Sequence, residues 1–225
     1  MKISALIPYK PDNGHRDNIW SLNKRRYEQF LPQIELCIGV DNSEPFCRAR
    51  AINEAAKSAS GDLFLIVDTD VVYNLNLINL IQIFIHVHPW IIPFNQGIRL
   101  TREATERLIS QNIPEIIQVG DTDIQEIVTC PGAFMNVMTR ACFESVQGLD
   151  ERFRGWGRED EAMVISLDTI CGRHFRMNEI IYHLWHTPAK NSPEYLNNND
   201  DLLFRYIAAR GDVAAMYKLI NERHN

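Results

Sequence analysis

The chain has 225 residues and a net charge of −6, with 45% hydrophobic and 23% charged residues. This size suits one domain, or one domain with a C-terminal extension. The composition excludes a largely disordered chain. The negative charge excludes a global electrostatic attraction to nucleic acid or acidic membranes.

Three further features limit the cellular context. The longest apolar stretch, residues 75–87, contains several polar residues and is too short to span a bilayer. No signal-peptide pattern is seen near Met1, so a cytoplasmic protein is expected. The five cysteines are odd in number and form no Cys-x-x-Cys pair, which indicates free thiols in a reducing compartment.

The first half alternates strand-like runs with helical patterns, as parallel α/β proteins do. Strands are predicted at 3–7, 34–40, 63–67 and 90–94, and helices at 15–30, 47–60, 75–87 and 101–110. Thr101 is a plausible N-cap. The 75–87 helix is apolar enough to predict burial on most sides. The fold class is therefore α/β with a mostly parallel central sheet flanked by helices.

The second half is less regular. It predicts strands at 127–138, interrupted at Pro131-Gly132, and at 175–184, and helices at 140–146 and 159–170. Residues 191–200 resemble a polar loop, and 202–223 a helical segment with a break at Gly211. The polar Asp121-Thr122-Asp123 sequence is expected to be a surface turn.

Polar residues follow the first two predicted strands. Pro8 and Tyr9 end the first strand and Asp41 follows the second. Ligands of open α/β sheets bind beyond the carboxyl ends of the strands, so these residues are expected to bind a nucleotide donor. Asp41 could accept hydrogen bonds from a base and Tyr9 could stack on it. Arg48 and Arg50 either reach a diphosphate or are solvated residues at a helix start.

The third strand, residues 63–67, is followed at once by Asp68 and Asp70. Such a carboxylate pair suits Mg²⁺ or Mn²⁺, although it can also cap the next turn. His183 and His186 follow a late strand. Imidazole suits Mn²⁺ better than it suits Mg²⁺. Residues three apart on an extended segment rarely face the same side. We therefore predict that one histidine binds the metal and the other supports it.

A third motif is Gly155-Trp156-Gly157-Arg158-Glu159-Asp160. With Cys130-Pro131-Gly132-Ala133-Phe134 and Gly148-Leu149-Asp150-Glu151-Arg152-Phe153, it resembles the galactosyltransferase segment shared by β-1,4-galactosyltransferases, polypeptide N-acetylgalactosaminyltransferases and chondroitin-type polymerases. Residues 3–70 look like the nucleotide-binding half of a GT-A glycosyltransferase. The resemblance implies a Rossmann-like GT-A catalytic domain over 1–190, with a nucleotide-sugar half at 2–100 and an acceptor half at 126–190. Residues 191–225 would be a helical extension.

The resemblance also implies roles for individual residues. Asp70 would bind Mn²⁺ (or Mg²⁺) together with His186 or His183, while Asp68 would contact the ribose or the metal. Asp160 would be the catalytic base and Glu159 an acceptor-binding residue. On the donor side, Trp156 would pack on the sugars, and Gly132 is a further expected donor-binding residue. Arg158 stands where the family usually has a glycine.

The expected function is an inverting, metal-dependent transfer of a sugar from a nucleotide sugar to an acceptor hydroxyl. The expected donor is a uridine-diphosphate sugar. The start of a helix should keep Asp160 ionised by lowering its pKa, against the neighbouring acidic residues. A glycan acceptor is favoured, and the basic run Lys24-Arg25-Arg26 keeps a modified DNA base open.

Two other functions remain as alternatives. A sugar-phosphate nucleotidyltransferase would need a glycine-rich loop after the first strand, and residues 9–14 contain one glycine. A catalytically inactive nucleotide-sugar-binding module would not need the intact acidic residues.

Overall fold

The computed structural model describes residues 1–129, 132–155, 157–187 and 193–224. Its central sheet has the order β2-β1-β3-β8-β5-β9. The strands are β1 (Ile3–Tyr9), β2 (Glu35–Val40), β3 (Leu63–Val67), β5 (Trp90–Ile92), β8 (Met135–Thr139) and β9 (Phe175–Arg176). β1 runs parallel to β2 and β3, whereas β8 runs antiparallel to β3 and β5. The predicted α/β class is confirmed, with a mixed sheet.

A second sheet of order β4-β10-β6-β7 lies beside the first. Its strands are β4 (Val71–Tyr73), β6 (Gln96–Leu100), β7 (Ile124–Val128) and β10 (Ile180–His183). The prediction of one strand over 175–184 is wrong, because the chain leaves the first sheet after Arg176 and enters the second at Ile180. β4 and β6 were not predicted, since three to five residues carry too little periodicity to be distinguished from a loop.

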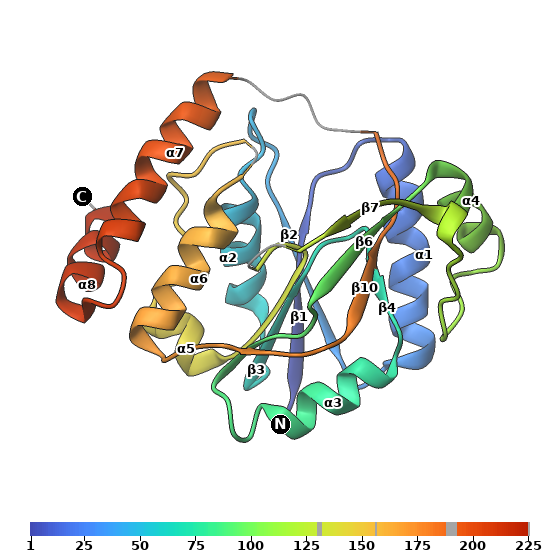
Figure 1. The fold of residues 1–225 in the computed structure, drawn as a ribbon, viewed down its shortest axis with the longest axis horizontal. Helices are drawn as coiled ribbons and strands as arrows, with labels where there is room; N and C mark the ends of the chain where they lie inside the picture. The colour runs from blue at the N-terminus through green and yellow to red at the C-terminus, as the bar shows by residue number, and fades with distance from the viewer. Residues whose placement is uncertain (130–131, 156, 188–192, 225) are drawn as a thin grey trace.

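The helices surround the two sheets (Figure 1). They are α1 (His15–Phe30), α2 (Arg48–Ser58), α3 (Asn76–Phe84), α4 (Arg102–Ser110), α5 (Arg140–Ser145), α6 (Glu159–Ile170), α7 (Pro193–Ala208) and α8 (Val213–Asn221), with 3₁₀ turns η1 (Asp121–Asp123) and η2 (Glu222–His224). α2 approaches β2 closely at Gly39, where an added Cβ would lie 1.7 Å from the carbonyl oxygen of Ala51. α7 and α8 form an outer layer over α6.

Several local predictions are confirmed. The ranges of α1, β3 and α6 agree with those expected, and the Thr101 side chain accepts a hydrogen bond from the backbone N–H of Ala104. The second Asp-Thr-Asp sequence is a surface turn, η1. Gly211 separates α7 from α8 with a φ of 79°.

Two local predictions are wrong. α3 is not buried on most sides: Ile83 is 62% exposed and Val87, just beyond the helix, is 74% exposed, because only one face of α3 meets the sheet. Residues 193–200 are helical rather than a loop. Pro193 begins that helix, and proline is favoured in the first turn.

The C-terminal helices share the main hydrophobic core. Leu203 and Tyr206 of α7 and Met216 of α8 belong to the same buried cluster as β1 and β3. The boundary at residue 190 remains a prediction. Cys37, Cys47, Cys142 and Cys171 are free thiols, while Cys130 lies outside the described residues. Across the described ranges, no helix is both long and apolar enough to cross a membrane.

Candidate active site

The carboxyl ends of β1, β2 and β3 lie together because the three strands are parallel and in register. The turn Asp68–Asp70 follows β3 directly and is fixed by its backbone: the Asp68 N–H donates to the Phe134 carbonyl (3.1 Å) and the Val71 N–H to the Asp68 carbonyl (3.2 Å). From α1, the buried Asn23 amide donates to the carbonyls of Thr69 and Val71. The two aspartates are therefore held on a rigid turn.

Asp70 is the centre of a possible metal site. Its carboxylate oxygens lie 3.5 Å from His183 Nε2 and 3.1 Å from His186 Nε2. The three side chains offer ligand atoms that all lie within 4.8 Å of one another. One carboxylate and two imidazoles form a mixed oxygen and nitrogen donor set that can bind a first-row divalent cation such as Mn²⁺. The residues present therefore fit such an ion.

Strand pairing explains why both histidines reach Asp70. His183 is the last residue of β10 and lies opposite Val71 of β4, next to Asp70 in sequence. The Leu184 N–H donates to the Asp70 carbonyl (2.8 Å), so the chain stays close as it leaves the strand. His186 lies beyond the strand end, where the alternation of side chains no longer applies. That one histidine binds the metal and the other supports it stays a prediction.

Charges around Asp70 favour its ionised form. Burial raises its pKa, but His183, His186 and Arg16 together lower the pKa below its ordinary value. Burial lowers the pKa of His183, which keeps that imidazole neutral and able to bind a metal. Burial also opposes protonation of His186, yet Asp70 raises its pKa overall.

Arg16, at the start of α1, was not predicted. Its Nε lies 3.5 Å from the Asp70 carboxylate and its Nη2 lies 3.2 Å from both ring nitrogens of His186. The sequence feature that could have identified Arg16 is a basic residue at the start of a predicted helix, shortly after the polar residues that follow β1.

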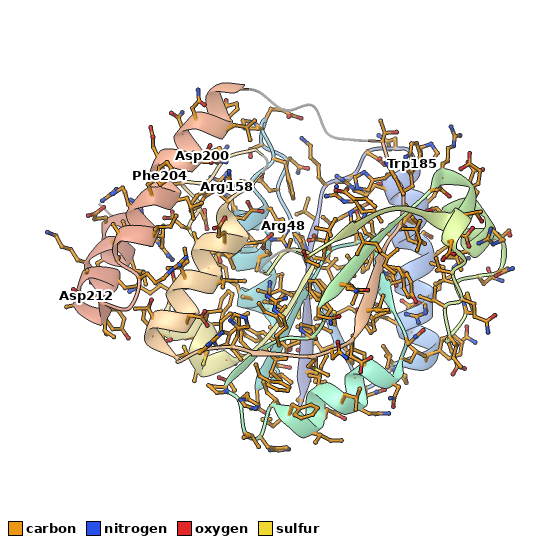
Figure 2. All side chains as sticks on the ribbon, viewed as in Figure 1. Arg48, Arg158, Trp185, Asp200, Phe204 and Asp212 are labelled. Atoms are coloured by element: carbon orange, nitrogen blue, oxygen red, sulfur yellow. The ribbon has the colours of Figure 1, made fainter. Side chains whose placement is uncertain are left out.

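A second cluster surrounds Arg48, at the start of α2 and near the middle of the molecule in Figure 2. Its guanidinium donates to Asp68 (2.8 Å) and to Asp160 (2.6 Å), and it lies 3.6 Å from Glu159. Its Nη2 is buried and has no hydrogen-bond partner among the residues that the structure describes. Neither expected role of Arg48 describes this arrangement fully, because the residue joins the Asp-Thr-Asp turn to the acidic start of α6.

Asp160 and Glu159 open α6 as predicted. The expected lowering of the Asp160 pKa is wrong. Burial raises this pKa to about 8, while Arg48 acts to lower it and Glu159 and Asp68 raise it further. Burial likewise raises the pKa of Glu159. Desolvation of two adjacent carboxyls outweighs the favourable field of the helix start.

The remaining predicted residues lie around this centre. Asp41 is buried and accepts hydrogen bonds from the Cys47 N–H and the Ser43 hydroxyl. Arg50 bridges Asp41 (3.3 Å) and Glu151 (3.1 Å). Pro8 is buried at the end of β1, and the Tyr9 hydroxyl donates to Asp17 (2.8 Å).

Gly132 has a φ of 78°, and a side chain there would strike Val164 of α6. Only glycine therefore fits this close approach to α6. Trp156 lies outside the described residues.

Comparison with solved structures identifies the fold. TarS of S. aureus, in complex with UDP-GlcNAc, has a TM-score of 0.54 at 13% identity, over 100% of this chain and 72% of that one. The mannosyltransferase PcManGT of Pyrobaculum calidifontis, with GDP-Man and Mn²⁺, has a TM-score of 0.53 at 12% identity, over 97% and 69%. Glucosyl-3-phosphoglycerate synthase of Mycobacterium tuberculosis gives 0.52 at 10% identity, over 94% and 80%. The chain thus has the GT-A fold, as predicted.

A family model described as the N-terminal domain of galactosyltransferase matches residues 125–188. This segment contains Gly132, the Gly155–Asp160 motif and both histidines. It is the same region that carries the sequence resemblance, so the resemblance to GT-A glycosyltransferases with a galactosyltransferase-type segment is confirmed. No curated protein matches the chain by sequence.

Proposed function

We propose that this protein is a metal-dependent glycosyltransferase that moves a sugar from a nucleotide-diphosphate sugar to an acceptor hydroxyl with inversion. The observation that carries the proposal is the pairing of two clusters on one turn. Asp70 lies with two histidines, and Asp68 is joined through Arg48 to Asp160. Arg48 thereby connects the turn proposed to bind the donor with the carboxylate proposed as the base.

Asp70, with His183, His186 or both, would hold Mn²⁺, an ion present in the GDP-Man complex of the Pyrobaculum protein. The bound ion would supply a Lewis acid beside the diphosphate. A uridine or guanosine base would lie over Tyr9 and Asp41, at the ends of β1 and β2. Arg16 and Arg48 would add positive charge on the donor side.

Asp160 is the proposed base. Its carboxylate would take the proton of the acceptor hydroxyl while that oxygen attacks the anomeric carbon, and the bond from that carbon to the nucleoside diphosphate would break. Arg48 holds the carboxylate in place, and the same arginine keeps Asp68 at a fixed distance from it. General base catalysis of this kind contributes typically 10²- to 10⁴-fold to the rate.

A glycan or another polyhydroxy compound is the proposed acceptor. The basic run that kept a DNA acceptor open offers less free charge in the folded protein, because Arg26 is buried and donates to the carbonyls of Tyr73, Pro114 and Glu115. Lys24 pairs with Glu28 at 3.8 Å.

The test is a screen of UDP-glucose, UDP-galactose, UDP-GlcNAc and GDP-mannose with Mn²⁺, measuring release of the nucleoside diphosphate with and without glycan acceptors. The isosteric Asp160→Asn variant is expected to fold and to bind UDP normally, yet to turn over at least ~10²-fold more slowly, because the amide cannot accept the proton. Turnover at the wild-type rate would disprove the role of Asp160. Donor binding without turnover in the wild type would indicate an inactive binding module.

A further inference from the structure

The turn that leads into α6 has an unusual backbone. Gly155, Gly157 and Arg158 all have positive φ angles, of 72°, 99° and 81°. For a non-glycine residue such as Arg158 this conformation is sterically strained. Arg158 immediately precedes Glu159 and Asp160, so any relaxation of the turn moves the acidic start of α6. The turn therefore requires support from neighbouring elements.

One side of this support comes from the loop before α2. The Gly155 N–H donates to the Phe46 carbonyl (3.1 Å), and Gly155 forms an isolated parallel bridge with Cys47. Arg48 follows directly and binds Asp160. The turn is thus tied to the same loop that positions Arg48.

The other side comes from Asn199 of α7. This side chain is 2% exposed. Its Nδ2 donates to the carbonyls of Arg154 and Gly157, each at 3.0 Å, and its Oδ1 accepts the Arg154 N–H at 3.1 Å. Both amide protons and the amide oxygen of Asn199 therefore form hydrogen bonds with the backbone of Arg154 and Gly157.

Asn199 belongs to a run of three asparagines that differ in their surroundings. Asn197 and Asn198 are exposed, whereas Asn199 lies on the buried face of α7 with Leu203 and Tyr206, which follow at helical spacing. Arg158 and Asp200 lie close together in Figure 2, with Arg158 Nε 2.6 Å from Asp200 Oδ1. This ion pair is a second link between the turn and α7.

We propose that Asn199 is a positioning residue that holds the backbone of Arg154 and Gly157 and thereby fixes Glu159 and Asp160 for transfer. The inference rests on the proposed function. It gives the C-terminal helices a part in catalysis, although they lie outside the galactosyltransferase-type segment at 125–188. An amide is needed because the turn presents two carbonyls and one N–H to a single buried side chain.

The experiment compares Asn199→Ala with Asn198→Ala, a matched change at the exposed neighbouring position. Asn199→Ala is expected to lower kcat by about tenfold or more, since small misplacements of catalytic groups are costly. Binding of UDP with Mn²⁺, measured by calorimetry, should stay within about twofold, because the groups assigned to UDP and the metal lie on other elements. Asn198→Ala should resemble the wild type in both measurements.

Hydrogen exchange gives a readout that does not depend on activity. In Asn199→Ala, amides of 154–160 should exchange about tenfold faster, while those of 68–73 should not change. Asn199→Asp keeps the accepted bond and loses both donated ones, so it should show the same effects and replaces the alanine variant if that protein does not fold.

Unchanged kcat and exchange in a folded variant would overturn the inference, as would equal losses of kcat and of UDP affinity. A wild-type protein that turns over no donor would instead contradict the proposed function, and the exchange measurement would still decide the role of Asn199.

Discussion

At the residue scale, burial controls the charge of Asp160. The carboxyl lies at a helix start and within 2.6 Å of Arg48, and both features favour ionisation. Its pKa is nevertheless raised to about 8, because the surroundings exclude water and contain Glu159 and Asp68. A base with a pKa close to neutrality is suited to accept a proton from a hydroxyl and to release it afterwards.

This pKa predicts the pH dependence of transfer. The ionised fraction of Asp160 rises as the pH approaches 8, so kcat/KM should rise with pH along an acidic limb whose midpoint lies well above the ordinary aspartate value of about 3.9. A bound cation would lower the pKa of Asp160, because nearby positive charge favours the carboxylate. The midpoint of the acidic limb should then lie at or below pH 8. Rates from pH 4 to 9 would test this, and a flat profile over that range would contradict it.

At the element scale, one buried carboxylate ties the loop before the Gly-Trp-Gly turn to the C-terminal helices. Asp150 accepts hydrogen bonds from Arg152 (2.7 Å) and from the Tyr206 hydroxyl of α7 (2.7 Å), and it lies 3.6 Å from Arg223 of η2. Burial raises the Asp150 pKa, but the bond to Arg152 and the charge of Arg223 lower it overall. The carboxylate is therefore ionised at neutral pH and stabilises the packing of α7.

Asp150→Asn should lower the free energy of unfolding by about 3–5 kcal/mol at neutral pH, because it removes the buried carboxylate that faces the largely buried side chain of Arg223. Since the folded pKa is below the unfolded one, this stabilisation is complete above about pH 3.9 and is lost as the pH falls through the folded value.

Urea unfolding at pH 7 and at pH 3 measures both effects. The difference in the free energy of unfolding between Asp150→Asn and the wild type should be smaller at pH 3 than at pH 7. The control is Asp121→Asn on the exposed turn η1, which should change stability by no more than about 0.5 kcal/mol. An Asp150→Asn protein as stable as that control would contradict the prediction.

At the scale of the whole molecule, the proposed metal site joins segments far apart in the chain. Asp70 follows β3 in the central sheet, whereas His183 ends β10 in the second sheet. A ligand that binds only the native arrangement of these segments stabilises the entire fold.

Mn²⁺ with UDP at 100 times its dissociation constant should therefore stabilise the protein by about 2.7 kcal/mol. For a chain of this size the midpoint of thermal unfolding should rise by roughly 2–4 °C for each kcal/mol. EDTA should abolish the shift, and so should Asp70→Asn. Asp121→Asn is a matched control, because it changes the other Asp-Thr-Asp sequence and should keep the full shift. A shift that persists in Asp70→Asn would contradict the metal assignment.

Elements with a strong local signal could be predicted from the sequence alone. The apolar run of β3, the helical spacing of α1 and the acidic first turn of α6 each depend on neighbouring residues, and their ranges agree with the structure. The Gly-Trp-Gly motif and the Asp-Thr-Asp turn were likewise recognisable from their order in the chain. These features sufficed to predict the GT-A fold.

The contacts between the residues of the candidate site could be seen only in the tertiary structure. The register of β10 against β4 brings His183 to Asp70, and no local pattern specifies strand pairing at that distance in sequence. Arg48 acquired three carboxylate neighbours from two distant segments, and Asn199 turned inward where two adjacent asparagines did not. The pKa of Asp160 depends on burial by the whole fold, whereas sequence reasoning could include only the helix start and the adjacent charges.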